Sequence, residues 1–60
     1  MKVIKDKTLY RFGGVKNVKV VGEVGINNIK HVVLEDIRGN RREVYKDLFF
    51  SHAKPMEQLK

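Results

Sequence analysis

The chain has 60 residues, enough for one small domain whose core has little room for an enclosed ligand cavity. It contains no cysteine, so disulfide bonds and thiolate metal sites are excluded. Thirteen Lys and Arg residues against seven Asp and Glu residues give a formal net charge of +6 at pH 7. A field of that sign attracts polyanions, and nucleic acid is the commonest of them.

The apolar residues favour strands over helices, because they fall in short β-branched runs separated by Gly and Asn. No unbroken apolar run exceeds three residues, whereas a membrane-spanning helix needs about 20. We therefore expect a cytoplasmic protein without a membrane segment. The predicted strands cover residues 8–12, 17–24, 30–37 and 41–46, with turns at 13–14, 26–28 and 38–40.

Cross-strand chemistry predicts the registers, because directly opposed residues favour complementary partners. In the second hairpin, a two-residue Asn-Asn loop would place Val20 against Glu35, so we prefer a three-residue loop, 26–28. That loop pairs Val20 with Leu34, Val21 with Val33, Lys19 with Glu35, and Glu23 with His31. In the third hairpin, a loop of Arg38, Gly39 and Asn40 pairs Leu34 with Val44, and Asp36 with Arg42.

These registers predict a half-buried antiparallel sheet with one apolar face turned inward. Val33 is expected on the opposite, more polar face. The predicted inward residues are Val18, Val20, Val24, Val32, Leu34 and Val44.

The chain beyond the fourth strand is predicted to be less regular. Residues 46–50, with three large apolar side chains, suit a single 3₁₀ turn that plugs the end of a barrel, and 50–53 suit a brief fifth strand. Pro55 has no N–H to donate, so regular pairing is expected to end there. We expect one domain over residues 1–53 and a flexible tail over 54–60.

This order of elements resembles the SH3-like small β-barrels, including KOW and Tudor-type domains. The residues that carry the resemblance lie in 18–24, in the hairpin 34–44, and at Asp47-Leu48-Phe49. The resemblance implies an all-β fold, a small SH3-like barrel of four to five antiparallel strands with a short 3₁₀ turn. It also implies nucleic-acid or peptide binding.

Nothing in the sequence indicates catalysis. The glycines fit turns and bulges, because a phosphate-binding loop needs Lys-Ser or Lys-Thr and a following helix. Ser51 and His52 are adjacent, and neighbouring side chains on a strand point to opposite faces, so they do not form a nucleophile–base pair. We expect no enzyme, no cofactor and no metal site.

Two basic groups are the candidate phosphate contacts. Arg38, Arg41 and Arg42 cluster at one hairpin tip, where each guanidinium could hold phosphate in a planar fork. The alternative is a solvated tip in which Arg42 pairs only with Asp36. The second group lies on or beside the first strand and consists of Lys5, Lys7, Arg11 and Lys16.

Aromatic rings decide whether bases can be stacked, and Tyr10 and Tyr45 are the two expected to be partly exposed. With so few rings, phosphate contact without strong sequence readout is the preferred hypothesis. The sequence thus predicts a small basic binding module, a nucleic-acid-binding or nucleoprotein regulatory factor. The alternative is a protein-interaction module, such as a phage-type regulator of a host protein. Free strand edges would allow either one to form a homodimer.

Overall fold

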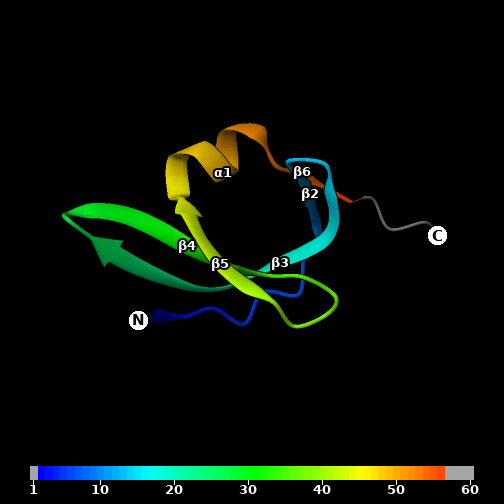
Figure 1. The fold of residues 1–60 in the computed structure, drawn as a ribbon, viewed down its shortest axis with the longest axis horizontal. Coiled ribbons are helices and arrows are strands. Elements are labelled where there is room, and N and C mark those ends of the chain that lie inside the picture. The colour runs from blue at the N-terminus through cyan, green and yellow to red at the C-terminus, as the bar shows by residue number, and fades with distance from the viewer. Residues whose placement is uncertain (1, 57–60) are drawn as a thin grey trace.

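The computed structural model describes residues 2–56, which form an antiparallel sheet and one short helix (Figure 1). The elements are β1 (Lys2–Val3), β2 (Tyr10–Phe12), β3 (Val15–Ile26), β4 (Ile29–Glu35), β5 (Arg41–Tyr45), α1 (Lys46–His52) and β6 (Lys54–Pro55). Strands pair in the order β5-β4-β3-β2-β6, and β1 pairs with β3. The predicted antiparallel sheet is confirmed. It is not a closed barrel within residues 2–56, because the end strands β5 and β6 are not paired with each other.

The first hairpin joins β2 to β3 through the predicted turn. Gly13 and Gly14 have φ of 60° and 81°, a left-handed conformation that glycine adopts without a Cβ clash. Tyr10 pairs with Val18 but Phe12 pairs with Val15, so β3 contributes one extra residue to this ladder. The result is a β-bulge at the start of β3, where Asn17 has φ of 60°.

The predicted register of the second hairpin is correct for only half of its pairs. Lys19 lies opposite Glu35 and Val20 opposite Leu34, as predicted, but Gly22 then lies opposite Val33 and Val24 opposite His31. The predicted pairs of Val21 with Val33 and of Glu23 with His31 are wrong, because the register shifts by one residue after Val20. Because of this bulge, the predicted pairs at the base of the hairpin form together with a two-residue loop at its tip.

That tip is formed by Asn27 and Asn28, with φ of 53° and 65°. Positive φ at both central residues is the signature of a type I′ turn, whose twist matches that of the flanking strands. The chain thus uses the Asn-Asn loop that cross-strand chemistry alone argued against.

The third hairpin has a longer loop than predicted. Val32 lies opposite Val44 and Leu34 opposite Arg42, so neither predicted pair, Leu34 with Val44 or Asp36 with Arg42, is formed. Residues 36–40 make the loop instead. Its ends are joined by the Asp36 N–H, which donates to the Asn40 carbonyl over 3.0 Å. The shift is two residues, which preserves the face on which each side chain of β5 lies.

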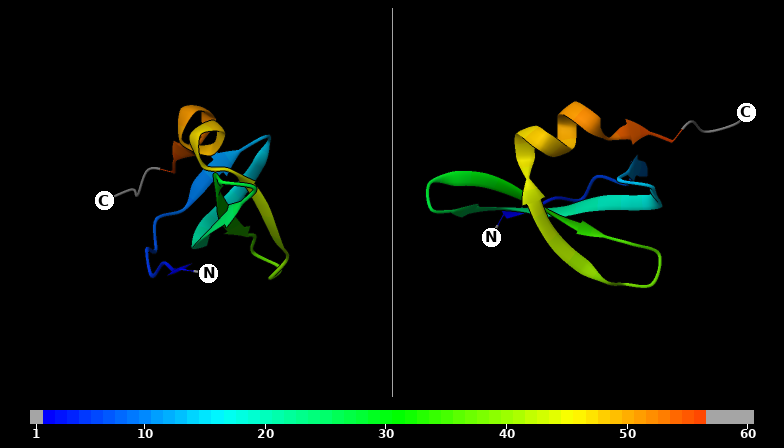
Figure 2. Two further views of the ribbon diagram at one scale, coloured as in Figure 1. Left: turned by 90° about the vertical axis from the view of Figure 1, so that its left-hand side faces the viewer. Right: turned by 45° about the horizontal axis from the view of Figure 1, so that its top comes forward.

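Helix α1 packs on the sheet through one ring. Phe49 is completely buried and contacts a cluster formed by Val20, Val32 and Leu34. Residues 46–50, predicted as a 3₁₀ turn, begin this α-helix, and the predicted strand at 50–53 is wrong because the helix continues to His52. A helical turn directs only Phe49 inward, so Leu48 and Phe50 remain about half exposed. Figure 2 shows α1 lying over one face of the sheet.

The inward face is largely as predicted. Val18, Val20, Val32 and Leu34 are buried, and Val44 is partly buried against them. The prediction that Val24 faces inward is wrong, because the bulge places Val24 on the same face as His31. Val33 lies on the face opposite the core, yet it is only 6% exposed.

The C-terminal part of the described chain is attached to the sheet. In β6, Lys54 lies opposite Arg11 and Pro55 opposite Tyr10. The Met56 N–H donates to the Leu9 carbonyl over 2.8 Å, and the Met56 sulfur accepts from the Asn17 N–H over 3.3 Å. Residues 57–60 of the predicted tail lie outside the described residues. Between residues 2 and 56, no helix is long and apolar enough to cross a membrane.

Candidate nucleic-acid interface

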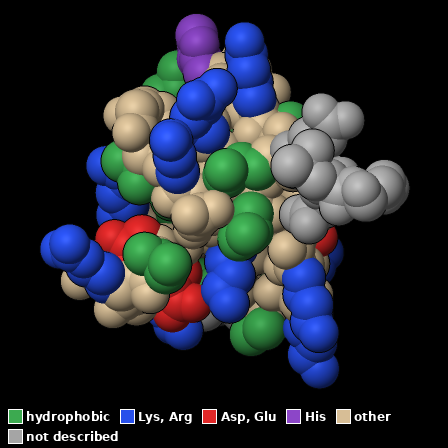
Figure 3. All heavy atoms as spheres, turned by 90° about the vertical axis from the view of Figure 1, so that its right-hand side faces the viewer, with side chains coloured by type: hydrophobic (Ala, Val, Ile, Leu, Met, Phe, Trp, Pro, Cys, Tyr) green, Lys and Arg blue, Asp and Glu red, His purple; other side chains and the backbone are tan. Residues whose placement is uncertain are grey.

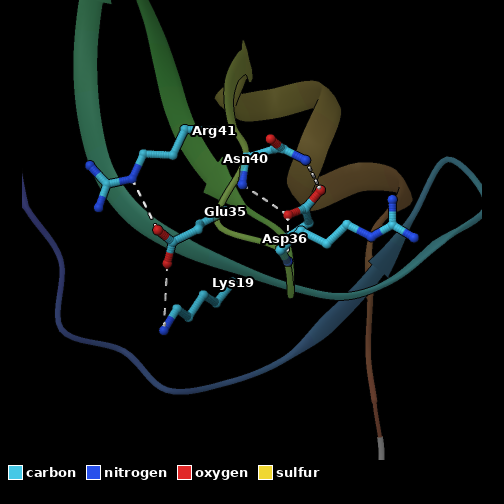
Figure 4. A network of polar contacts seen from close by, with 6 residues as sticks. Lys19, Glu35, Asp36, Asn40 and Arg41 are labelled. Atoms are coloured by element: carbon cyan, nitrogen blue, oxygen red, sulfur yellow. Dashed lines mark hydrogen bonds and ion pairs between the residues drawn. The ribbon is translucent and has the colours of Figure 1, made fainter.

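The three arginines at the β4–β5 hairpin do not share one environment. Arg41 turns toward Glu35, whose carboxylate also takes the ammonium of Lys19 (Figure 4). The Nε of Arg41 is 3.1 Å from Glu35 Oε2, and the Nζ of Lys19 is 3.7 Å from Oε1. Both cations are thus partly neutralised within the protein. Neither is as available to an external phosphate as its exposure suggests.

Arg38 sits in a loop that Asp36 organises. One carboxylate oxygen of Asp36 accepts from the N–H groups of Arg38, over 2.9 Å, and Asn40, over 3.0 Å, while the other accepts from the Asn40 amide (Figure 4). Partial desolvation opposes ionisation of Asp36, but these hydrogen bonds outweigh it, and its pKa is lowered from the usual 3.8. The loop therefore holds a carboxylate close to the Arg38 backbone.

Arg42 lies on the other face of β5 from Arg41. It is opposite Leu34, and it lines a small depression together with Asp36, Asn40 and Arg41. Arg41 and Arg42 thus leave β5 on opposite faces, and Arg38 lies in the loop 36–40.

A second group of cations converges at the opposite side of the sheet, around β2 and β6. Arg11, Lys16 and Lys54 line one surface depression with Pro55 and Met56. Arg11 and Lys54 are direct cross-strand neighbours, an arrangement of like charges that destabilises a sheet. No carboxylate of residues 2–56 lines this depression. Figure 3 shows the end of the molecule that includes β2 and β6, where Lys and Arg predominate over small areas of Asp and Glu.

We call Arg11, Lys16 and Lys54 the basic cluster. Arg11 and Lys16 were predicted as phosphate contacts, whereas Lys54 was assigned to the tail and missed. In the sequence, only the charge of Lys54 could have pointed to it, because its place beside Arg11 depends on the pairing of β6 with β2.

Lys5 and Lys7 precede β2 in a segment without regular structure. Both are exposed, and neither lines the depression of the basic cluster. They flank Asp6, whose carboxylate accepts from the Thr8 N–H over 3.0 Å and from the Thr8 hydroxyl over 2.8 Å. The first of these bonds is the main reason that the pKa of Asp6 is lowered from 3.8. These two lysines therefore share their surroundings with a carboxylate that stays ionised.

The two tyrosines differ in exposure. The ring of Tyr10 is partly buried and meets Phe49 and Phe50 edge-on, with centroids 5.1 Å and 6.3 Å away. Tyr45 is 53% exposed, and its ring centroid is 4.8 Å from that of His31. Only Tyr45 presents much of its ring to solvent. Phe50, 52% exposed, is an aromatic surface that the sequence reasoning assigned to the core.

Tyr45 lines a groove between α1 and the tip of the β3–β4 hairpin. The groove has a volume of about 640 Å³ and is lined by Asn28, Ile29, Lys30, Tyr45, Asp47, Leu48, Ser51 and His52. Ser51 and His52 both border it, but they are consecutive residues of α1 and no hydrogen bond joins them among the described contacts. No group of three His, Asp or Glu residues within 2–56 is placed to hold a metal ion.

Searches against known protein families, curated proteins and solved structures find no match to this chain.

Proposed function

We propose that this protein is a nucleic-acid-binding module and not an enzyme, and that it contacts phosphates through the basic cluster. The observation that carries the proposal is the convergence of Arg11, Lys16 and Lys54 on one depression that no carboxylate of residues 2–56 lines. In contrast, Arg41 and Lys19 already share Glu35. Cations that no carboxylate of residues 2–56 neutralises gain most from an external phosphate.

The pairing of Arg11 with Lys54 supports the same proposal. Like charges directly opposite in an antiparallel pair reduce stability, so a fold that keeps them together loses free energy in the unbound state. A phosphate between them removes that repulsion. The order of hairpins, helix and last strand also supports a relationship to SH3-like domains, which we retain as a proposal for this open sheet.

The test is the salt dependence of binding to a short DNA or RNA duplex. For a duplex, the logarithm of the association constant falls with log salt by about 0.9 per phosphate neutralised. Replacing Arg11 and Lys54 together with Gln should flatten the slope by about one to two units. The matched control is Lys5→Gln with Lys7→Gln, which removes the same charge outside the cluster. Equal losses from both double variants would mean that binding depends only on the net positive charge. Absence of binding to both duplex and single-stranded nucleic acid at low salt would refute the proposal.

A further inference from the structure

We infer that the groove between α1 and the β3–β4 hairpin tip receives one base of a single-stranded nucleic acid, which stacks on Tyr45. This inference rests on the proposed function and adds to it the class of nucleic acid that is recognised. It concerns a second surface. The basic cluster lies around β2 and β6 and the groove beside the turn of the β3–β4 hairpin, and these elements lie at opposite ends of the molecule (Figure 1).

The first observation is the exposed ring of Tyr45. More than half of this side chain is exposed, and His31 contacts the ring without lining the groove. The imidazole therefore supports the tyrosine ring and leaves it available to a base. Stacking of a base on an aromatic ring is worth several-fold to more than a hundredfold in affinity, whatever the sequence.

The second observation is the chemistry of the groove walls. Ile29 and Leu48, 48% and 45% exposed, supply apolar surface in the same groove as the ring. Lys30 and His52 supply N–H groups that can donate to a backbone phosphate. The same groove carries polar groups suited to the edge of a base, namely the amide of Asn28, the hydroxyl of Ser51 and the carboxylate of Asp47, which accepts from an exocyclic amino group.

A base fits this combination better than an apolar peptide segment does. An apolar segment would use Ile29 and Leu48 but would leave the charged and polar groups of the rim without partners. A nucleotide has a flat apolar face, hydrogen-bonding edges and an anionic phosphate, and each has a counterpart here. A second copy of the chain is also disfavoured, because each copy carries a net charge of +6.

A duplex cannot occupy the groove in this way, since its bases are stacked on one another. The molecule is 40 Å along its longest axis, so the basic cluster and the groove can be bridged by one flexible strand. We therefore expect a preference for single-stranded over double-stranded nucleic acid, with phosphates at the basic cluster and a base at Tyr45.

The experiment measures fluorescence anisotropy with a labelled single strand of about 12 nucleotides, a length within the range of about 4–16 nucleotides that one OB-fold domain covers. A duplex of the same length is measured in parallel. Tyr45→Leu keeps an apolar side chain but removes the ring, and Phe50→Leu is the matched control, because Phe50 is equally exposed outside the groove. Circular dichroism establishes that each variant is folded.

We expect Tyr45→Leu to weaken single-strand binding by at least about fivefold, and Phe50→Leu by less than about twofold. Tyr45→Phe should recover most of the affinity, because the ring is retained. Equal effects of Tyr45→Leu and Phe50→Leu, or no effect of Tyr45→Leu, would overturn the inference. In that case, loss of binding in the Arg11→Gln, Lys54→Gln variant would still support the proposed function, and the two failures are thus distinguishable.

A second measurement identifies the occupant of the groove. In amide chemical-shift mapping, a nucleoside monophosphate should shift Lys30, Tyr45 and Leu48 more than any other described residue. Shifts confined to the basic cluster would overturn the inference. An aliphatic peptide such as acetyl-Gly-Leu-Leu-Gly-amide that shifts these three amides, where the nucleotide does not, would assign the groove to a protein segment.

Discussion

Tyr10 of β2 meets Phe49 of α1 edge-on, with ring centroids 5.1 Å apart and an angle of 73° between the planes. This contact connects the strand that carries Arg11 to the only side chain of α1 that is buried. Phe12 reaches the same ring, also at 5.1 Å. The core of this small protein is therefore centred on Phe49.

Replacing Phe49 should unfold the protein. Truncating a buried Phe to Ala costs about 3–5 kcal/mol, which approaches the total stability of so small a domain. Phe49→Ala should lose the cooperative thermal transition in circular dichroism. Phe50→Ala, next to it but half exposed, should lower Tm only slightly. Similar losses from both variants would contradict the helical placement of the two rings.

A charge at Val33 should also be severely destabilising. The sequence pattern alone places Val33 on the polar face, which predicts that Val33→Asp is milder than Leu34→Asp. In the structure, both side chains are buried, with exposures of 6% and 2%. An unpaired carboxylate at either site costs more than this domain can lose. Both variants should be unfolded at 25 °C by circular dichroism, and a stable Val33→Asp protein would refute the burial of this residue.

The turn of the β3–β4 hairpin can be improved. Asn27 and Asn28 both have positive φ, and Gly adopts this conformation with less strain than Asn. Asn28→Gly should raise Tm by a few degrees, because Asn-Gly is the favoured pair for this turn. Asn28→Val, a β-branched residue in the same position, should lower Tm. A longer loop with ordinary φ values would show the reverse order or no difference.

Acid should loosen the loop 36–40. Because the folded-state pKa of Asp36 is lowered, its contribution to stability is present above the usual value of 3.8 and is lost as the pH falls through the folded value. Asp6 contributes in the same direction. Between neutral pH and about pH 3, Tm should therefore fall less for Asp36→Asn than for the native protein. An identical pH dependence would show that Asp36 is not linked to folding.

Reversing the charge of Lys54 should stabilise the protein while weakening its binding to nucleic acid. Lys54→Glu converts a repulsive cross-strand pair with Arg11 into an attractive one, which should raise Tm by about 2–6 °C. Lys7→Glu makes the same change in net charge outside any strand pair. It should leave Tm nearly unchanged. Equal gains in both variants would attribute the effect to net charge alone.

The fold could be predicted where the charged and the apolar residues of one strand both match those of its neighbour. Lys19 and Val20 were correctly paired with Glu35 and Leu34, since both the charges and the apolar residues match there. The bulge after Val20 could not be predicted, because pairing rules assume that each residue has one partner. The loop 36–40 was missed for a similar reason, as the side chain of Asp36 satisfies backbone N–H groups that a pairing argument leaves to the ladder.

The candidate site was less predictable than the sheet. Arg11, Lys16 and Tyr45 were identified by type, but their grouping depends on contacts between distant parts of the chain. Lys54 joins Arg11 only through β6, a strand that contains a proline. The neutralisation of Arg41 by Glu35 follows from a register two residues away from the predicted one. Charge composition indicates that cations are available, and tertiary structure decides which ones converge.

The bulge after Val20 means that the hairpin does not require a fixed chain length at this point. A protein without Val21 could keep every β3–β4 pair, and each remaining side chain would stay on its present face. What such a deletion would remove is an attachment, since the Val21 carbonyl accepts the Ile4 N–H over 3.1 Å. The extra residue thus serves the N-terminal segment and not the hairpin. A tolerated deletion here would remove this one attachment of the N-terminal segment, whereas the pairs of Lys2 with Glu23 and of Val3 with Gly22 do not involve Val21.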